Sequence, residues 1–212
     1  MTGVKLILGF LMLMVPANAA VTLNQIETFA TLGGWGSGSS GNPNPPAILT
    51  DSGPLGTGDS SLKVTANGGG GAGSRLVALN TSAWAGDYSG QGIVSLAANL
   101  RNLGSTPLSI RVAFNGPGGR FVTDAVLVAA FVGWVQHVFD IRPVSLLNAT
   151  GSDAAATMAA VTEARILHSS TVDFRGADVS SSFLVDNLQA VPEPHSCMLL
   201  ILAGPLLCFR KR

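Results

Sequence analysis

Short runs of alternating apolar and polar residues, separated by glycine-rich breaks, fill the middle of this sequence. Residues 62–66 read Leu-Lys-Val-Thr-Ala, an alternation with a period of two that is typical of a strand with one buried face. The breaks are strong, because residues 67–73 contain five glycines and residues 115–119 read Asn-Gly-Pro-Gly-Gly. These closely spaced glycine-rich breaks favour short strands joined by turns over long helices.

Candidate strands recur along the chain at the short spacing of a β-sandwich. They cover residues 21–29, 62–66, 75–79, 93–100, 108–114, 121–129, 134–141, 161–168 and 183–191. Only residues 154–160 favour a helix, of one or two turns, and charged residues make up only 11% of the chain. We therefore predict an all-β fold, a single β-sandwich of jelly-roll type over residues 20–190, with residues 31–58 as a long irregular loop.

The first nineteen residues have the pattern of a secretory signal peptide. Lys5 supplies a positive charge, residues 6–15 are apolar, and Ala17-Asn18-Ala19 is a small-x-small cleavage site. A buried N-terminal helix is the alternative, which Pro16 disfavours because it ends the apolar run. We expect a signal peptidase to cleave after Ala19.

The last 22 residues have a different pattern. Two prolines make the stretch Val191, Pro192, Glu193, Pro194 an extended linker. An apolar run follows at residues 197–209, and the chain ends on the basic residues Arg210, Lys211 and Arg212. As a helix the run would reach about 20 Å, short of the ~30 Å hydrocarbon core of a bilayer. We expect a short transmembrane helix with its basic end on the cytoplasmic side.

This order of motif, helix and basic end resembles the PEP-CTERM sorting signal of Gram-negative bacteria. The resemblance implies that residues 191–212 are a sorting signal in which Val191, Pro192, Glu193 and Pro194 are the recognition motif. It implies cleavage near the motif by an exosortase, a membrane protease, so that the inner membrane holds the chain only before processing. It also implies a final location in the cell envelope or the extracellular matrix. The alternative is a permanently membrane-anchored surface protein.

Charge and cysteine content exclude some classes of function for the predicted domain. Residues 20–190 carry eight Lys and Arg side chains against eleven Asp and Glu. We expect no nucleic-acid partner, because such binding depends on neutralising phosphates with a basic surface. Both cysteines, Cys197 and Cys208, lie in the C-terminal segment, so the domain must be held by its core without disulfides.

The predicted domain also resembles carbohydrate-binding modules and galactose-binding-like jelly rolls. The resemblance is carried by residues 58–64, 84–88, 133–140 and the closing strand 183–188, which reads Phe-Leu-Val-Asp-Asn-Leu. Many members of those families bind one structural calcium ion between the first and last strands. The resemblance implies Glu27, Asp59 and Asp186 as its ligands, and carboxylate oxygens suit calcium. The alternative is that the three carboxylates are ordinary strand-end or capping residues.

A sugar site would need an exposed aromatic face beside hydrogen-bonding groups. Trp35, Trp84 and Tyr88 are the candidates, because they stand in polar, glycine-rich surroundings and not on alternating strands. The alternative for Trp84 is that it closes one end of the sandwich.

The sequence shows no catalytic grouping. It has no Gly-x-Ser-x-Gly elbow, no His-x-x-x-His pair and no pair of carboxylates marked as an acid and a base. From these features we expect an exported, non-enzymatic envelope or matrix protein that binds extracellular polysaccharide. A polysaccharide-acting enzyme on a jelly-roll fold is the alternative.

Overall fold

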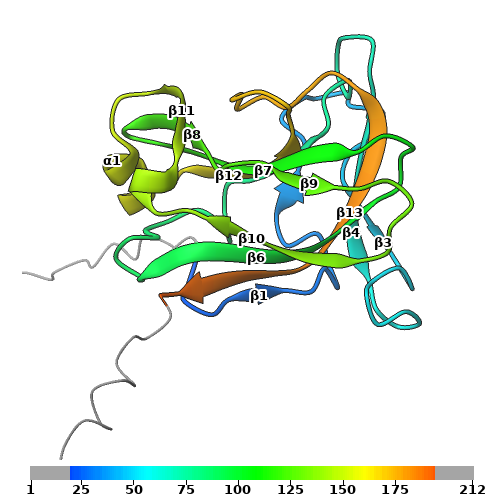
Figure 1. Ribbon diagram of the computed structural model, residues 1–212, viewed down its shortest axis with the longest axis horizontal. Helices are drawn as coiled ribbons and strands as arrows, with labels where there is room; N and C mark the ends of the chain where they lie inside the picture. Colours follow the sequence, from blue (N-terminus) through cyan, green and yellow to red (C-terminus); the bar gives the residue numbers. More distant parts are fainter. Residues whose placement is uncertain (1–19, 194–212) are drawn as a thin grey trace, which may run out of the picture.

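Two antiparallel sheets face each other in the computed structural model, which describes residues 20–193 (Figure 1). The predicted signal peptide, Pro194, the apolar run and the three basic terminal residues lie outside the described residues. Within residues 20–193 no helix is both long enough and apolar enough to cross a bilayer. The predicted all-β sandwich is confirmed.

The first sheet, here called the six-stranded sheet, is built around the long last strand. Its order is β10 (Val135–Asp140), β6 (Ile93–Asn102), β13 (Ser180–Pro192), β4 (Ser61–Asn67) and β3 (Ala47–Leu49), with β1 (Ile26–Glu27) also paired to β13. Strand β13 therefore has β6 on one side, and β4 and then β1 on the other.

The second sheet, here called the seven-stranded sheet, lies opposite. Its order is β11 (Leu147–Gly151), β8 (Gly119–Val122), β7 (Leu108–Gly116), β12 (Glu163–His168), β5 (Val77–Asn80) and β2 (Trp35–Gly36), with β9 (Val126–Val128) also paired to β7. Strands adjacent in this sheet are often distant in sequence, so the sheet joins parts of the chain that no local pattern connects.

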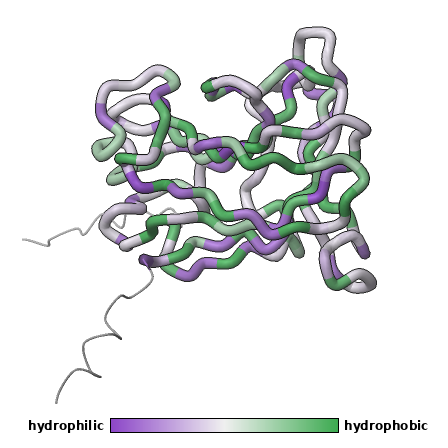
Figure 2. Tube along the Cα trace, in the orientation of Figure 1, coloured by the Kyte–Doolittle hydropathy of each residue, from purple (hydrophilic) through white to green (hydrophobic). Residues whose placement is uncertain are grey.

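Alternation along the strands builds the core between the sheets. In β7, Ile110, Val112 and Phe114 are buried in the main apolar cluster, while Arg111 and Ala113 face the other side of the sheet. Apolar and polar residues alternate in the same way along strands of both sheets (Figure 2). Burying one such large side chain contributes about 1.5–3 kcal/mol, and this core is what stabilises the fold of residues 20–190, which contain no cysteine.

The helical content is small. The helix α1 (Ala154–Ala159) confirms the one helix expected, and the Asp153 side chain caps it by accepting a hydrogen bond from the Ala156 backbone N–H at 3.0 Å. A single 3-10 turn, η1 (Pro143–Ser145), is the other helical element among residues 20–193.

Some predicted elements differ in the structure. The first strand is only Ile26–Glu27, because Asn24 and Phe29 have φ angles of 62° and 51°, which break an extended chain on both sides. The predicted loop 31–58 contains the short strands β2 and β3, and β11 was not predicted at all.

The predicted strand 121–129 is two strands, β8 and β9. Thr123, just after β8, leaves the regular ladder. Its backbone N–H donates to the Val112 carbonyl at 2.9 Å, and its hydroxyl accepts from the Val112 N–H at 3.1 Å. Because a side chain replaces a backbone acceptor at this point, the strand is interrupted there.

The domain extends two residues beyond its predicted end at Ala190. Val191 pairs with Ser95 and Pro192 with Ile93, so the first half of the predicted sorting motif closes β13 and is not a free linker. A proline is tolerated there because the pairing register with β6 shifts between Val191 and Pro192, and such an irregularity in the ladder accommodates a residue without a backbone N–H. Glu193 follows it and is exposed.

Candidate functional site

The three aromatic residues predicted to stack on sugar are core residues. Trp35 is 3% exposed, and Trp84 and Tyr88 are fully buried. The Trp35 and Trp84 ring centroids lie 6.5 Å apart, and the Tyr88 hydroxyl donates to the Trp84 carbonyl at 2.8 Å. Burial also raises the pKa of the Tyr88 phenol. The predicted stacking role is wrong, because none of these ring faces is open to a ligand.

The three predicted calcium ligands lie around one irregularity in β13. Val185 pairs with Leu62 of β4, whereas Leu188 pairs with Glu27 of β1, so the neighbouring strand changes between these two positions. Asp186 and Asn187 occupy the change, and Asn187 has a φ angle of 49°. The interrupted pairing leaves a gap in the ladder, and the buried Asp186 carboxylate lies beside it.

Each of these carboxylates is held by local hydrogen bonds. Asp186 accepts from the Asn187 backbone N–H at 2.7 Å and from its side-chain amide at 3.3 Å. Glu27 accepts from the Phe29 N–H at 3.3 Å, and Asp59 accepts from the Leu55 N–H at 2.8 Å. These bonds fit the strand-end and capping role that was the alternative to calcium binding.

The charges of Asp59 and Glu27 nevertheless act on Asp186. Burial is the main cause that raises the pKa of Asp186 to about 6; the hydrogen bond from the Asn187 N–H opposes the rise, and the two negative charges add to it. Among residues 20–193, however, no group of three or more His, Cys, Asp or Glu side chains is close enough to hold a metal ion. The three predicted residues therefore lie near one another, but their carboxylates are not close enough together to bind one calcium ion as predicted.

The outer face of the seven-stranded sheet carries a second apolar cluster, separate from the core. It comprises Ala113, Val122, Leu167 and Phe174, with Val77, Leu147 and Ala149 packed against it. Phe174 is only 4% exposed and comes from the loop 169–179 between β12 and β13. The loop therefore folds back over the outer face and places its ring on the sheet.

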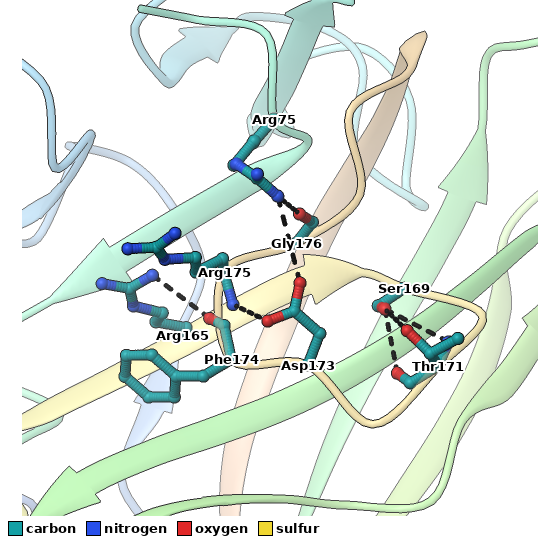
Figure 3. A network of polar contacts seen from close by, with 8 residues as sticks. All are labelled: Arg75, Arg165, Ser169, Thr171, Asp173, Phe174, Arg175 and Gly176. Atoms are coloured by element: carbon teal, nitrogen blue, oxygen red, sulfur yellow. Dashed lines mark hydrogen bonds and ion pairs between the residues drawn. The ribbon is translucent and has the colours of Figure 1, made fainter. Parts of the chain in front are cut away.

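Buried and charged hydrogen bonds fix this loop. The Arg111 side chain, 7% exposed, donates to the Ser169 carbonyl at 3.1 Å and to the Thr123 carbonyl at 2.7 Å. Further along, the Asp173 carboxylate accepts from the Arg175 N–H at 2.9 Å and forms a tight turn. Figure 3 shows that the loop is tied at its start by Ser169 and Thr171 and at its end by Gly176.

Two arginines enclose the Phe174 ring. The Arg165 guanidinium lies 4.1 Å from the ring centroid and that of Arg120 lies 5.0 Å from it. Arg165 also donates to the Phe174 carbonyl at 3.2 Å. Cation–π contacts restrict both guanidinium groups, and the hydrogen bond to the Phe174 carbonyl restricts that of Arg165 further.

A cleft of about 340 Å³ opens beside this loop. One wall is the segment 37–42 together with Gly71 and Gly73, the floor is Val77 and Leu79 of β5, and three arginines complete the lining: Arg75, Arg165 and Arg175. Gly73 has a φ angle of 79°, and a Cβ atom there would lie 2.3 Å from the Asn42 amide oxygen, so this wall requires glycine. Sequence reasoning treated the glycine run as a loop and missed the cleft.

A smaller hollow of about 270 Å³ lies on another part of the same loop. It is lined by Arg120, Ala149, Thr150, Val172, Asp173, Phe174 and Arg175. Arg175 therefore lines both hollows, which makes it the residue that links them.

The acidic side chains on this face are engaged by arginines. Glu163 forms an ion pair with Arg165, and Asp173 lies 3.9 Å from Arg75. Each carboxylate thus interacts with an arginine side chain of the same face. Neither lines the cleft of about 340 Å³, and none of the residues that line this cleft is an Asp or Glu of the kind that glycoside hydrolysis uses as acid and base.

Comparison with known proteins gives a likeness in fold alone. No family model matches the chain, and no curated protein matches it in sequence. Among solved structures, a family 11 carbohydrate-binding module from Clostridium thermocellum, in complex with a β-1,3-1,4-mixed-linked tetrasaccharide, superposes with a TM-score of 0.54 at 17% identity, covering 81% of this chain and 96% of that one.

Two further structures show the same architecture. The family 11 module of the cellulosomal cellulase Lic26A-Cel5E of Clostridium thermocellum gives a TM-score of 0.53 at 16% identity, covering 82% of this chain and 98% of that one. An exo-β-agarase gives 0.50 at 12% identity, covering 85% of this chain but only 24% of the enzyme. The chain therefore has the jelly-roll fold of carbohydrate-binding modules.

Proposed function

We propose that this protein is a non-catalytic polysaccharide-binding sandwich, and that the cleft on the outer face of the seven-stranded sheet is its binding site. The observation that carries the proposal is the cleft itself, an open hollow lined by hydroxyl, amide and guanidinium groups over an apolar floor. Sugar sites combine such polar groups with apolar contact. The shared fold with carbohydrate-binding modules supports the same reading.

A steric block tests the location of the site. Ser39 is exposed and lines the cleft, so Ser39→Trp should fill the hollow and abolish retention of residues 20–193 on polysaccharide gels. Ser89→Trp is the control, because Ser89 is also exposed but lies outside the cleft. Equal retention of both variants would place binding elsewhere, and no retention of the unaltered domain on any polysaccharide would end the proposal.

The proposal includes export and processing of the chain. The predicted cleavage site after Ala19 stands next to Val21, which is buried and donates its backbone N–H to the Ala85 carbonyl at 2.8 Å. At the other end the fold stops at Pro192, inside the proposed exosortase motif. Both proposed cuts thus fall at edges of the folded domain.

Intact-mass analysis of the protein from envelope material tests the processing. We expect a product that starts at Ala20 and lacks residues 197–212. A mass that retains these C-terminal residues would favour the permanently anchored alternative.

A further inference from the structure

Four of the eight Lys and Arg side chains between residues 20 and 190 gather around one loop. Arg75, Arg165 and Arg175 line the larger hollow, and Arg120 and Arg175 line the smaller one. These residues come from before β5, from β8, from β12 and from the loop after β12. The sheet pairing brings them together in a domain that is otherwise acidic.

The carboxylates on this face do not balance these four charges. Glu163 pairs with Arg165 and Asp173 with Arg75, whereas no ion pair or side-chain hydrogen bond is formed by the Arg120 or Arg175 guanidinium within residues 20–193. Figure 3 shows the Arg175 and Arg165 guanidinium groups pointing in the same direction, away from Asp173. The face thus presents an excess of positive charge with the Arg175 donors free.

We propose that this arginine-lined face binds the negatively charged substituents, carboxylate or sulfate, of an acidic polysaccharide. The inference rests on the proposed function and specifies its ligand. A guanidinium presents paired N–H donors that match the oxygens of these anions. Phe174 holds Arg165 and Arg120 in place, so less conformational entropy is lost on binding.

The two hollows also suit a polymer. Arg175 lines both, and the larger one, at about 340 Å³, lies in the size range of about 300–1,000 Å³ found for small-ligand sites. Successive charged sugars of one chain can therefore meet arginines on both sides of Arg175.

Affinity electrophoresis of residues 20–193 tests the proposal, with polygalacturonate as the carboxylate probe, dextran sulfate as the sulfate probe, and dextran as the neutral probe. We expect retardation by at least one acidic polymer, weakening in 0.5 M NaCl, and little by dextran. Arg175→Ala should weaken binding about tenfold, since a hydrogen bond to a charged group is lost.

Arg101→Ala is the matched control. Arg101 is an exposed arginine on β6 of the other sheet, so its removal changes the net charge equally but leaves both hollows intact. Equal weakening by the two variants would show a general charge effect and overturn the proposal. So would equal retardation by polyglutamate, which has the charges without the sugar.

The outcomes separate this inference from the proposed function. Retardation by dextran but by neither acidic polymer would overturn the charge specificity and leave polysaccharide binding standing. No retardation by any of the three polysaccharides would count against both.

Discussion

At the scale of single residues, Asp186 shows how an interruption in strand pairing changes the pKa of a side chain. It is fully buried beside the change of strand from β4 to β1, and its negative neighbours oppose its ionisation. The pattern Val-Asp-Asn revealed the position of this residue, but burial and strand pairing determine its chemistry, and no sequence pattern reports those.

The pH dependence of stability follows from Asp186. Its pKa rises on folding from an ordinary value of 3.8 to about 6, so between these values the folded state holds a proton that the unfolded state has lost. This contribution to stability is therefore lost as pH rises from about 4 to 6, by up to about 3 kcal/mol, and is constant above. Urea unfolding at pH 4.5 and pH 7.5 without calcium should show that Asp186→Asn gains about 2 kcal/mol more stability over the unaltered domain at the higher pH than at the lower one.

Adding calcium in the same experiment tests whether Glu27, Asp59 and Asp186 bind this ion, although the structure does not bring the three carboxylates close enough together. We expect no change in the unfolding midpoint. A rise in the unaltered domain that is absent in Asp186→Asn would contradict this and restore the calcium prediction.

The buried aromatic residues give a second prediction at this scale. Trp84→Ala should destabilise the domain by about 3–5 kcal/mol, because it leaves a cavity next to Trp35 and Tyr88. Thermal or denaturant unfolding measures the loss. A variant that remained as stable as the unaltered domain but no longer bound polysaccharide would reinstate Trp84 as a ligand contact.

At the scale of elements, sequence reasoning found most long strands and the helix. It failed where side chains or unusual backbone angles interrupt a strand, as Thr123 does between β8 and β9 and Asn24 does before β1. It also missed β11, whose pairing with β8 is a long-range contact. Period-two patterns report which face is buried, not which strand is the neighbour.

The contact between α1 and the β7–β8 turn can be tested with one methyl group. A Cβ atom on Gly118 would lie 1.7 Å from the Asp153 carbonyl oxygen, whereas a Cβ atom on Gly133 meets nothing within 4 Å. Gly118→Ala should therefore cost about 1–3 kcal/mol in the free energy of unfolding, as overpacking does, and Gly133→Ala little. Equal stability of the two variants in guanidinium unfolding would show that this contact is absent.

At the scale of the whole molecule, the sandwich was predictable but the proposed binding face was not. Arg75 and Arg165 are far apart in the sequence and meet because β5 pairs with β12, where Leu79 lies opposite Arg165. Aromatic residues were the obvious candidates for a sugar site, yet the fold uses them to close its core. The lining of the polar cleft combines the segment 37–42, residues 71–79, Arg165 of β12 and Arg175 of the loop that carries Phe174, which are far apart in the sequence.

An NMR titration of ¹⁵N-labelled residues 20–193 with acidic oligosaccharides, such as those derived from polygalacturonate, tests the central claim most directly. The account predicts that amide shifts concentrate in residues 37–42, 71–79 and 163–176, around the cleft and its loop, and that they vanish in Ser39→Trp. Shifts confined to the outer face of the six-stranded sheet, along β6 and β10, or no shifts with any acidic or neutral oligosaccharide, would contradict it.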